Sequence, residues 1–449
     1  MGRLFGTDGI RGEANRYPMD GIMAFQFGQA ITHLLRKKKN KPGIIIGRDT
    51  RVSGCMLERA LEAGITSMGG NAYDLGILPT PGIALVTREM GFDAGIVISA
   101  SHNPYQDNGI KAFDADGFKL SDEEEDHIED LILNNRLPDL APPPGQIGSG
   151  ERVHDAKERY VSFLKNTFPH DLSMKRIKIV LDTANGATYE IAPKVFDDLG
   201  ADVEIINNNP DGFNINDNCG SQFTGDLEKM VKDSGAAIGL AFDGDGDRLI
   251  AVDENGRTIT GDQILIICAK MLKDQGLLKN DMLVSTVMSN LGLSIACKQY
   301  GFGHHASKVG DRYVLEQMLR LNAVLGGEDS GHLIFLNHHT TGDGTLAAIQ
   351  LVAAMVRENR PLSDLARQMS IFPQKLINVE VGSKPELSTV QEIEEVIKDV
   401  ETQLGDQGRV LVRYSGTQNL CRVMVEGPSY DLTDQYCKKI ADIVRISLG

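Results

Sequence analysis

The chain has 449 residues, which is too long for one ordinary hydrophobic core and indicates about three domains. Hydrophobic residues make up 41% of it and charged residues 24%, a balance typical of a globular protein and unlike that of a disordered chain. The net charge of −16 disfavours a nucleic-acid or anionic-membrane partner, so a phosphorylated ligand would need a locally basic site.

The cysteines and the N-terminus indicate a cytoplasmic protein. Six cysteines are scattered along the chain without a CxxC pair or metal-ligand spacing, as expected for thiols that stay reduced. The opening residues MGRLFGTDGIRG lack the apolar stretch of a signal peptide, and Gly6 stands where a myristoylation motif needs Ser or Thr. No apolar run is long enough to span a bilayer. We therefore expect a cytoplasmic protein without a membrane partner.

Three segments repeat one pattern: an apolar strand, a helical stretch, a second strand, another helix, and a third strand that ends in a polar loop. They begin at KPGIIIGRDTR (41–51), RIKIVLDTANGA (176–187) and DMLVSTVMSN (281–290). Strands that alternate with helices are typical of parallel α/β units. Each repeat therefore delivers one polar loop from an equivalent position.

The C-terminal part has a different pattern. Short strands are expected at QKLINVEV, GRVLVRY and LCRVMVEG, with amphipathic helices near 390–404 and 432–448. This favours a small α+β domain with an antiparallel sheet. We therefore predict an α/β protein with three similar parallel-type domains and one C-terminal α+β domain. The predicted boundaries are 1–152, 153–255, 256–367 and 368–449.

The first polar loop is ASHNP, which follows the apolar run Ile96–Ile98. Asn103-Pro104 interrupts the chain, because a residue before proline avoids helical conformations. Ser101 and His102 therefore lie on a tight turn past the carboxyl end of a strand, where open α/β sheets bind ligands. These residues alone are equally compatible with a turn in which Ser101 caps the loop and His102 faces solvent.

The second polar loop is DGDGDR, with carboxylates at alternate positions: Asp243, Asp245 and Asp247. Three carboxylates without His or Cys indicate a hard cation bound through oxygen, and we expect one Mg²⁺ per chain. An EF-hand is excluded because Arg248 occupies the position that requires Gly, and the flanking residues are strand-like. A solvated acidic turn is disfavoured, because three aspartates packed together without a cation repel one another.

The third loop, GGEDSGH, carries Glu328, Ser330 and His332, whose side chains suit the vicinal hydroxyls of a sugar. By itself this string also fits an ordinary polar turn. Arg11 in GTDGIRG and Lys111 in NGIK lie on glycine-rich segments that allow close approach to a ligand. Taken singly, each would be an ordinary solvated cation.

The fourth loop, RYSGTQN, forms the end of a predicted hairpin. Guanidinium groups, hydroxyls and glycine amides together suit a phosphate group, whereas an exposed turn has no need of two arginines. The predicted phosphate-binding residues are Arg413, Ser415, Gly416, Thr417 and Arg422.

Together the four loops supply a serine nucleophile, a cation site, a hydroxyl-binding loop and a second anion site. A phosphate site remote from the cation implies a substrate with a phosphate group at its other end. The order of ASHNP, DGDGDR, GEDSGH and RYSGTQN over the whole chain resembles the α-D-phosphohexomutase superfamily. Within it, GTDGIRG, STVMSNLGL, FNINDNCGS and HTTGDG are most similar to the bacterial phosphoglucosamine mutases.

The resemblance implies four domains around a central cleft, with a phosphorylated Ser101 as phosphoryl carrier and as a ligand of Mg²⁺ beside the three aspartates. It implies that glucosamine 6-phosphate and glucosamine 1-phosphate interconvert through a 1,6-bisphosphate, which also activates the enzyme, and that the product supplies UDP-N-acetylglucosamine and cell-wall precursors. The expected catalytic residues are Ser101, His102, Lys111, Arg11 and His332, and the expected sugar-binding residues are Lys308, Asp311, Glu328, Ser330 and Arg248.

Two departures from that branch are visible. Asp329 stands where it usually has Gln, and Gln418-Asn419 stands where Glu-Pro is common. We expect Asp329 to add a carboxylate that favours the amine of glucosamine. The alternatives are a phosphomannomutase or phosphoglucomutase, a metal-dependent sugar phosphatase, and a non-catalytic sugar-phosphate sensor. The expected partner is a small sugar phosphate and not nucleic acid, and a homodimer remains open.

Overall fold

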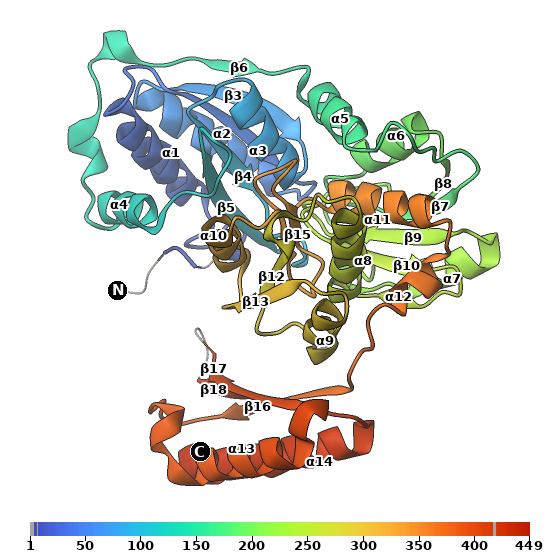
Figure 1. Ribbon diagram of the computed structural model, residues 1–449. Coiled ribbons are helices and arrows are strands. Elements are labelled where there is room, and N and C mark those ends of the chain that lie inside the picture. The colour runs from blue at the N-terminus through green and yellow to red at the C-terminus, as the bar shows by residue number, and fades with distance from the viewer. Residues whose placement is uncertain (1–3, 7, 416–418) are drawn as a thin grey trace. The chain divides into compact units, whose positions relative to one another are not determined.

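The computed structural model describes residues 4–6, 8–415 and 419–449 (Figure 1). The chain forms two compact units. Unit 1 comprises Met1–Val287 and Gly303–Arg367, and unit 2 comprises Met288–Phe302 and Gln368–Gly449. No helix in the described part of the chain is long and apolar enough to cross a membrane.

The first sheet of unit 1 has the strand order β1-β5-β4-β2-β3-β6. Strands β4, β2, β3 and β6 are parallel, and β5 and β1 run antiparallel at one edge. Every residue of β4 is buried, as expected for a strand whose two faces are covered by helices. Its elements are β1 (Ile10–Glu13), α1 (Gly21–Arg36), β2 (Gly43–Arg48), α2 (Gly54–Ser67), β3 (Asn71–Ile77), α3 (Thr80–Glu89), β4 (Ala94–Ile98), β5 (Asp107–Asp114), α4 (Asp122–Leu133) and β6 (Gly150–Arg152).

Helices α1 and α2 pack closely because glycine lies at their contact. A Cβ atom added to Gly64 would lie 2.1 Å from the carbonyl oxygen of Phe25, so no larger residue fits there. Ser121 caps the N-terminus of helix α4, and its hydroxyl accepts from the amide of Glu124 in a capping box. The segment after α4 contains two short 3₁₀ helices, η1 (Leu137–Leu140) and η2 (Pro144–Gln146), before β6.

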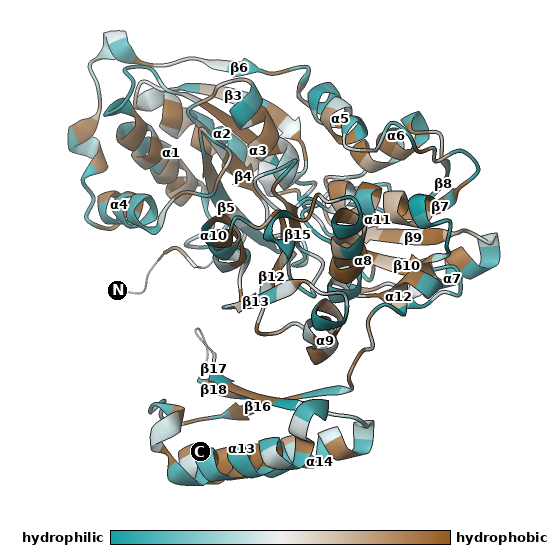
Figure 2. Ribbon diagram, viewed as in Figure 1, coloured by the Kyte–Doolittle hydropathy of each residue, from teal (hydrophilic) through white to brown (hydrophobic). Residues whose placement is uncertain are grey.

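The other two sheets of unit 1 have the orders β11-β10-β9-β7-β8 and β13-β12-β14-β15. Figure 2 shows β9 and β10 as hydrophobic strands, in agreement with their complete burial. The second sheet and its helices are α5 (Ala156–Asn166), β7 (Lys178–Asp182), α6 (Ile191–Asp198), β8 (Asp202–Ile206), α7 (Gly225–Ser234), β9 (Ile238–Phe242), β10 (Leu249–Asp253) and β11 (Thr258–Ile259). The third comprises α8 (Gly261–Asp274), β12 (Met282–Thr286), β13 (Gly303–Ser307), α10 (Asp311–Leu321), β14 (Leu325–Gly327), β15 (Leu333–Phe335), α11 (Gly344–Glu358) and α12 (Leu362–Ala366).

Each of the three polar loops joins a parallel strand to an antiparallel one. Strand β5 folds back on β4, β10 on β9, and β15 on β14. The prediction of three α/β domains is confirmed. In addition, all three share an antiparallel strand after the polar loop, which was not predicted. Because the three loops occupy the same position in their sheets, they present their side chains from equivalent sheet edges.

Unit 2 contains the predicted antiparallel sheet, in the order β16-β18-β17. Its elements are α9 (Leu291–Gln299), β16 (Gln374–Glu380), α13 (Gln391–Leu404), β17 (Arg409–Tyr414), β18 (Leu420–Glu426) and α14 (Tyr430–Leu448). The buried Ile440 and Val444 of α14 and Val400 of α13 pack with β18 in one core. Figure 2 shows hydrophobic and hydrophilic residues alternating along α14, as expected for an amphipathic helix.

A fully buried carboxylate attaches residues 288–302 to this sheet. Glu426 is 0% exposed, and its Oε2 accepts from the backbone amide of Leu291 at 2.9 Å and from Nε of Arg409 at 2.7 Å. Its Oε1 accepts from Nδ2 of Asn290 at 3.3 Å. Residues 288–302 therefore group with the C-terminal sheet, although α9 is also the crossover between the parallel strands β12 and β13 of the third α/β domain, to which these residues were predicted to belong.

A buried hydrogen bond joins α5 to the start of α11. The Tyr160 hydroxyl donates to Oδ2 of Asp343 at 3.0 Å, and Oδ1 of Asp343 accepts from the amide of Leu346 at 2.9 Å. Both side chains are fully buried, and burial raises the pKa of Asp343 to about 7.

This pKa predicts a pH-dependent contribution to stability. Between pH 3.8 and about 7 the folded protein keeps a proton on Asp343 that the unfolded chain has lost, so stability falls as the pH rises through this window. We expect Asp343→Asn to remove a slope of about 1.4 kcal/mol per pH unit. Melting temperatures measured across the window check this, with the exposed Asp139→Asn as control; parallel profiles for both variants would contradict it.

Candidate active site

The nucleophile loop places Ser101 at the end of β4 with its side chain turned inward. Ser101 is 1% exposed and has a φ of +52°, a left-handed conformation that is uncommon outside glycine. Its amide donates to Oγ of Ser99 at 2.9 Å, and its Oγ donates to Oδ2 of Asp243 at 2.5 Å. The predicted serine and the predicted cation loop are therefore in direct contact.

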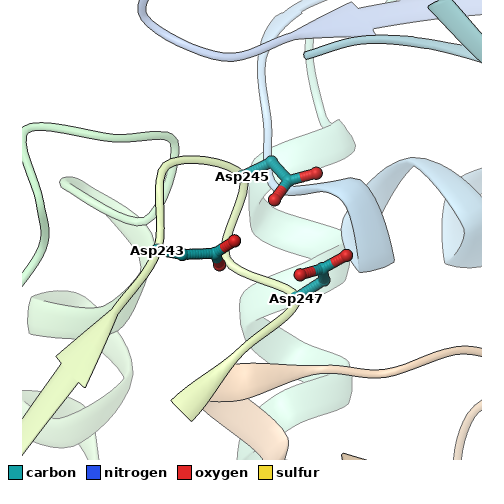
Figure 3. A group of neighbouring side chains, drawn as sticks. All are labelled: Asp243, Asp245 and Asp247. Atoms are coloured by element: carbon teal, nitrogen blue, oxygen red, sulfur yellow. The ribbon is translucent and has the colours of Figure 1, made fainter. Parts of the chain in front are cut away.

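The cation loop between β9 and β10 carries Asp243, Asp245 and Asp247, whose side chains converge in Figure 3. All three are buried, and one ligand oxygen from each lies within 4.8 Å of the others. A Cβ atom on Gly244 would lie 2.6 Å from the carbonyl oxygen of Ser101, so glycine is required where this loop meets the nucleophile turn.

Neighbouring segments anchor the backbone of this loop. The carbonyl of Gly244 accepts from the amide of Ala187 at 2.8 Å, and that of Asp245 from the amide of Thr80 at 2.9 Å. The carbonyl of Gly246 accepts from the amide of Gly344 at 3.0 Å. Because these donors come from all three α/β domains, the loop is held rigidly where they meet.

The carboxylates fit a divalent cation. Oδ1 of Asp245 and Oδ1 of Asp247 are buried and accept no hydrogen bond from the described residues. Burial and the neighbouring charges of Asp247 and Asp245 raise the pKa of Asp243 well above its usual value. A cation with oxygen ligands would satisfy both the bare oxygens and the repulsion, and Mg²⁺ is the ion that such a set prefers.

Lys111 lies among the carboxylates. From β5 its Nζ reaches Oδ2 of Asp245 at 3.1 Å, Oδ2 of Asp8 at 3.3 Å and Oδ2 of Asp247 at 3.7 Å. Burial opposes its charge, but the three carboxylates outweigh burial and raise the pKa of Lys111. Lys111 is therefore a fixed positive charge beside the triad at any physiological pH.

His332 lies between two carboxylates on the loop from β14 to β15. Its Nδ1 is 3.5 Å from Oδ2 of Asp247, and its Nε2 is 3.7 Å from Oδ2 of Asp311. Burial lowers its pKa, but Asp247 and Asp311 more than offset this and raise it to about 8. The backbones of Arg248 and His332 also pair as an isolated antiparallel bridge, which fastens the cation loop to the third loop.

Arg11 lies on β1 in an ion pair with Asp8, and its Nη1 donates to the carbonyl of Ala100 at 3.4 Å. Asp8 also pairs with Lys119 at 2.5 Å, and Lys119 pairs with Asp311 at 2.5 Å. Burial would raise the pKa of Asp8, but Lys111, Lys119 and Arg11 hold it well below its usual value. The sequence did not lead us to predict Asp8 or Lys119 as site residues. Asp8 lies in the motif GTDGIRG, from which only Arg11 was predicted.

His102 follows the nucleophile directly, and its Nδ1 lies 3.4 Å from Oγ of Ser101. Burial lowers its pKa to about 4, with a further contribution from the charges of Arg248 and Arg11. The imidazole is therefore neutral at pH 7. It can exchange a hydrogen bond with the serine hydroxyl, but its catalytic role stays a prediction.

Four of the five predicted sugar-binding residues lie on two adjacent segments, GGEDSGH and KVGDRYV (308–314), and the fifth, Arg248, ends the cation loop. Oε1 of Glu328 accepts from the amide of Gly310 at 3.0 Å, which ties GGEDSGH to KVGDRYV. Ser330 is exposed, as is Lys308, whose Nζ lies 5.7 Å from the ring centroid of Tyr313. Asp311 contacts the buried charges around the triad through Lys119 and His332. Arg248 contacts the triad directly, since its amide donates to Oδ1 of Asp243 at 3.1 Å and its Nε lies 3.8 Å from Oδ1 of Asp247.

Asp329 has a different position from the one expected. Its Oδ1 accepts from the amide of Asp262 at 3.3 Å, and its carbonyl accepts from the amide of Gly261 at 3.0 Å, at the N-terminus of α8. A carboxylate is favourable there because the first amides of a helix lack internal partners. The structure therefore explains Asp329 as a helix contact, and the expectation that it selects for an amine loses its basis.

The predicted phosphate site lies in unit 2. Arg413 on β17 and Arg422 on β18 are direct cross-strand partners, and burial together with the charge of Arg422 lowers the pKa of Arg413. Like charges directly opposite each other are destabilising without an anion. Ser415 is buried, and its amide donates to the carbonyl of Leu420 at 2.8 Å. Gly416 and Thr417 lie outside the described residues.

A buried network behind the nucleophile was not predicted. Arg51 is 1% exposed and forms an ion pair with Asp49, and Oγ of Ser99 donates to Oδ2 of Asp49 at 2.5 Å. The available signal was GRDTR at the end of the first strand, a charged run directly after a buried segment.

A serine hydroxyl against an acidic triad, with lysine and arginine nearby, is an arrangement suited to phosphoryl transfer. The chain matches four domain families described as phosphoglucomutase/phosphomannomutase: domain I over residues 2–139, domain II over 158–256, domain III over 260–372 and the C-terminal domain over 376–443. It belongs to the phosphoglucomutase/phosphomannomutase family and is an enzyme of the phosphohexomutase type.

Relatives agree with this assignment, and a solved structure has the same fold. The chain is 67% identical to the phosphoglucosamine mutase of Syntrophobacter fumaroxidans and 58% identical to that of Syntrophus aciditrophicus, in each case over 100% of both chains. A phosphoglucomutase/phosphomannomutase family protein from Burkholderia thailandensis has the same fold, with a TM-score of 0.83 at 23% identity, covering 99% of this chain and 97% of that one.

We predict that the triad binds one divalent cation. Titration with Mg²⁺ by calorimetry, or with Mn²⁺ by electron paramagnetic resonance, should give one site per chain. Asp247→Asn should weaken binding by about tenfold or more, because it removes one ligand charge. The exposed Asp217→Asn serves as control and should bind like the wild type. Equal affinity in all three proteins would show that the ion binds elsewhere.

Proposed function

We propose that this protein interconverts glucosamine 6-phosphate and glucosamine 1-phosphate, with phosphorylated Ser101 as the phosphoryl carrier and a hexose 1,6-bisphosphate as intermediate and activator. The observation that carries the proposal is the 2.5 Å contact between Oγ of Ser101 and Oδ2 of Asp243 within a buried acidic triad. Relatives named phosphoglucosamine mutase, up to 67% identical over the whole chain, support the choice of sugar.

In the proposed first half-reaction, O1 of glucosamine 6-phosphate attacks the phosphorus on Ser101, and the bond from Oγ to phosphorus breaks. The proton of O1 then passes to Oγ, for which neutral His102, 3.4 Å from Oγ, is the suitable relay. In the second half-reaction the 6-phosphate returns to Ser101 and the proton moves to O6. A Mg²⁺ ion held by the three aspartates and Ser101 would neutralise charge on the transferring group.

The residues around the triad would stabilise that charge. Lys111 lies against Asp245, Arg11 pairs with Asp8, and His332 lies between Asp247 and Asp311, so all three are placed to interact with the transferring group. We propose that Glu328, Ser330, Lys308, Asp311 and Arg248 contact the sugar.

The phosphate group that is not being transferred needs a separate site. We propose that unit 2 binds it through Arg413, Arg422, Ser415, Gly416 and Thr417. This group is the 6-phosphate in one half-reaction and the 1-phosphate in the other. General donors such as guanidinium groups and hydroxyls accept both orientations, because they impose no single geometry.

A phosphomannomutase or phosphoglucomutase activity is the second candidate. The matching domain families carry both names, and the serine, triad and cations are equally suited to any hexose phosphate. With Asp329 turned toward α8, no described carboxylate is assigned to the sugar amine. Glucosamine phosphate is therefore proposed on the strength of the relatives.

Phosphorylation of Ser101 is the first prediction of this proposal. After incubation with glucose 1,6-bisphosphate and Mg²⁺, the intact mass of the wild type should rise by one phosphoryl group. Ser101→Ala should show no increase and should lose turnover by at least about 10⁴-fold, because the covalent route is closed. The exposed Ser121→Ala is the control. Near-normal turnover in Ser101→Ala would refute the covalent scheme.

Substrate choice is the second prediction. We expect kcat/KM for glucosamine 1-phosphate to exceed that for glucose 1-phosphate by about ten- to a hundredfold, the effect of one hydrogen bond from the charged amine to a neutral acceptor. Asp329→Gln should leave this ratio within about twofold, because its carboxylate faces the amides of α8. Equal or better turnover of glucose 1-phosphate would move the assignment to the second candidate, and a collapsed ratio in Asp329→Gln would restore a role for this residue.

A further inference from the structure

The backbone of the nucleophile turn is gripped from two sides. Nη2 of Arg51 donates to the carbonyl of Ser101 at 3.1 Å and to that of Asn103 at 2.5 Å. Nδ2 of Asn216 donates to the same two carbonyls, each at 2.9 Å. We call these two donors, Arg51 and Asn216, the carbonyl clamp. Arg51 belongs to the first α/β domain and Asn216 to a loop of the second.

The clamp acts on the strained part of the turn. Ser101 has a φ of +52°, and its carbonyl and that of Asn103 converge on the same donors from either side of His102. Two converging carbonyl oxygens repel each other unless shared donors lie between them. The four hydrogen bonds therefore favour the left-handed conformation that turns Oγ of Ser101 toward Asp243.

Asn216 is itself firmly placed. Its backbone has a φ of +58°, its amide donates to the carbonyl of Ala184 at 2.9 Å, and its side chain is buried. It also packs on the cation loop, since a Cβ atom on Gly244 would lie 2.8 Å from Nδ2 of Asn216. One amide group therefore touches both the nucleophile turn and the loop that carries the triad.

We propose that Asn216 is a positioning residue for phosphoryl transfer: through the carbonyls of Ser101 and Asn103 it holds the serine Oγ in line with the acidic triad. It does not touch the reacting atoms. The inference rests on the proposed function, because a role in positioning Ser101 requires Ser101 to carry the phosphoryl group. It gives a physical role to FNINDNCGS, a segment that the reaction scheme leaves unused.

The test compares Asn216→Gly with Asn218→Gly. Glycine tolerates the left-handed backbone at both sites, where φ is +58° and +53°, so the matched pair isolates the loss of the Asn216 amide. Asn218 is exposed, and its side chain bonds to Asp217, away from the turn. The readouts are kcat and KM, phosphate uptake on Ser101 by intact mass, and hydrogen exchange of the peptide that contains Ser101 and Asn103.

We expect Asn216→Gly to lower kcat by about ten- to a hundredfold with KM within about threefold, because a nucleophile displaced by an ångström reacts far more slowly. Phosphate uptake should slow and hydrogen exchange of the turn should quicken, whereas Asn218→Gly should match the wild type. Asn216→Asp keeps the size of the side chain but presents an acceptor to the two carbonyls. It should lose at least as much activity as Asn216→Gly.

Two failures can be told apart. A wild type that neither takes up phosphate nor converts sugar phosphates contradicts the proposed function before any variant is compared. An active wild type with Asn216→Gly equal to Asn218→Gly in kcat and in exchange overturns the inference alone. The inference is also overturned if the fall in kcat is fully explained by a smaller fraction of folded protein, measured by melting and by active-site titration with the bisphosphate. An Asn216→Asp variant with full activity would overturn it as well.

Discussion

Three buried carboxylates within 4.8 Å of one another are the constraint around which unit 1 is built. Burial and their mutual repulsion favour protonation, which is why the pKa of Asp243 is raised, so all three stay ionised only if positive charge surrounds them. Lys111 and His332 reach them from the first and third α/β domains, and Arg248 adjoins them in the second. The charge balance of the triad therefore depends on side chains from all three α/β domains.

The compensating charges form a continuous alternating series. Asp245 pairs with Lys111, Lys111 with Asp8, Asp8 with Lys119, Lys119 with Asp311, and Asp311 approaches His332, which returns to Asp247. Because each cation is shared between carboxylates, each is oriented before a substrate arrives. Preoriented charges are what a transferring phosphoryl group requires, since they need no rearrangement during the reaction.

The sequence patterns predicted local features well and long-range ones poorly. Apolar runs identified buried strands such as β4 and β9, and alternate aspartates identified the triad, because both signals lie within a few residues. The antiparallel direction of β5, β10 and β15 was missed, since the pattern within a strand does not encode the direction of its partner. Lys119 was missed for a similar reason: a lone lysine looks solvated until the fold brings Asp8 and Asp311 to it.

Asp329 shows a different limit of sequence reasoning. Its place in a polar loop suggested a ligand contact, but the structure joins that loop to the N-terminus of α8, so a partner 67 residues away in the chain decides where the carboxylate lies. The carbonyl clamp likewise depends on a contact between residues far apart in the chain. An asparagine in FNINDNCGS has no local feature that links it to a turn more than a hundred residues earlier.

Unit 2 is assembled from two separate stretches of chain, and this limits how the protein can be divided. A fragment cut at the apparent boundary before Gln368 would lack Asn290 and the amide of Leu291, leaving the buried Glu426 with fewer hydrogen-bond donors. Exchange of the C-terminal region between relatives would create the same mismatch unless residues 288–302 were exchanged with it. For truncation and chimera design, residues 288–302 should therefore be kept together with the C-terminal sheet, even though they lie within the third α/β repeat.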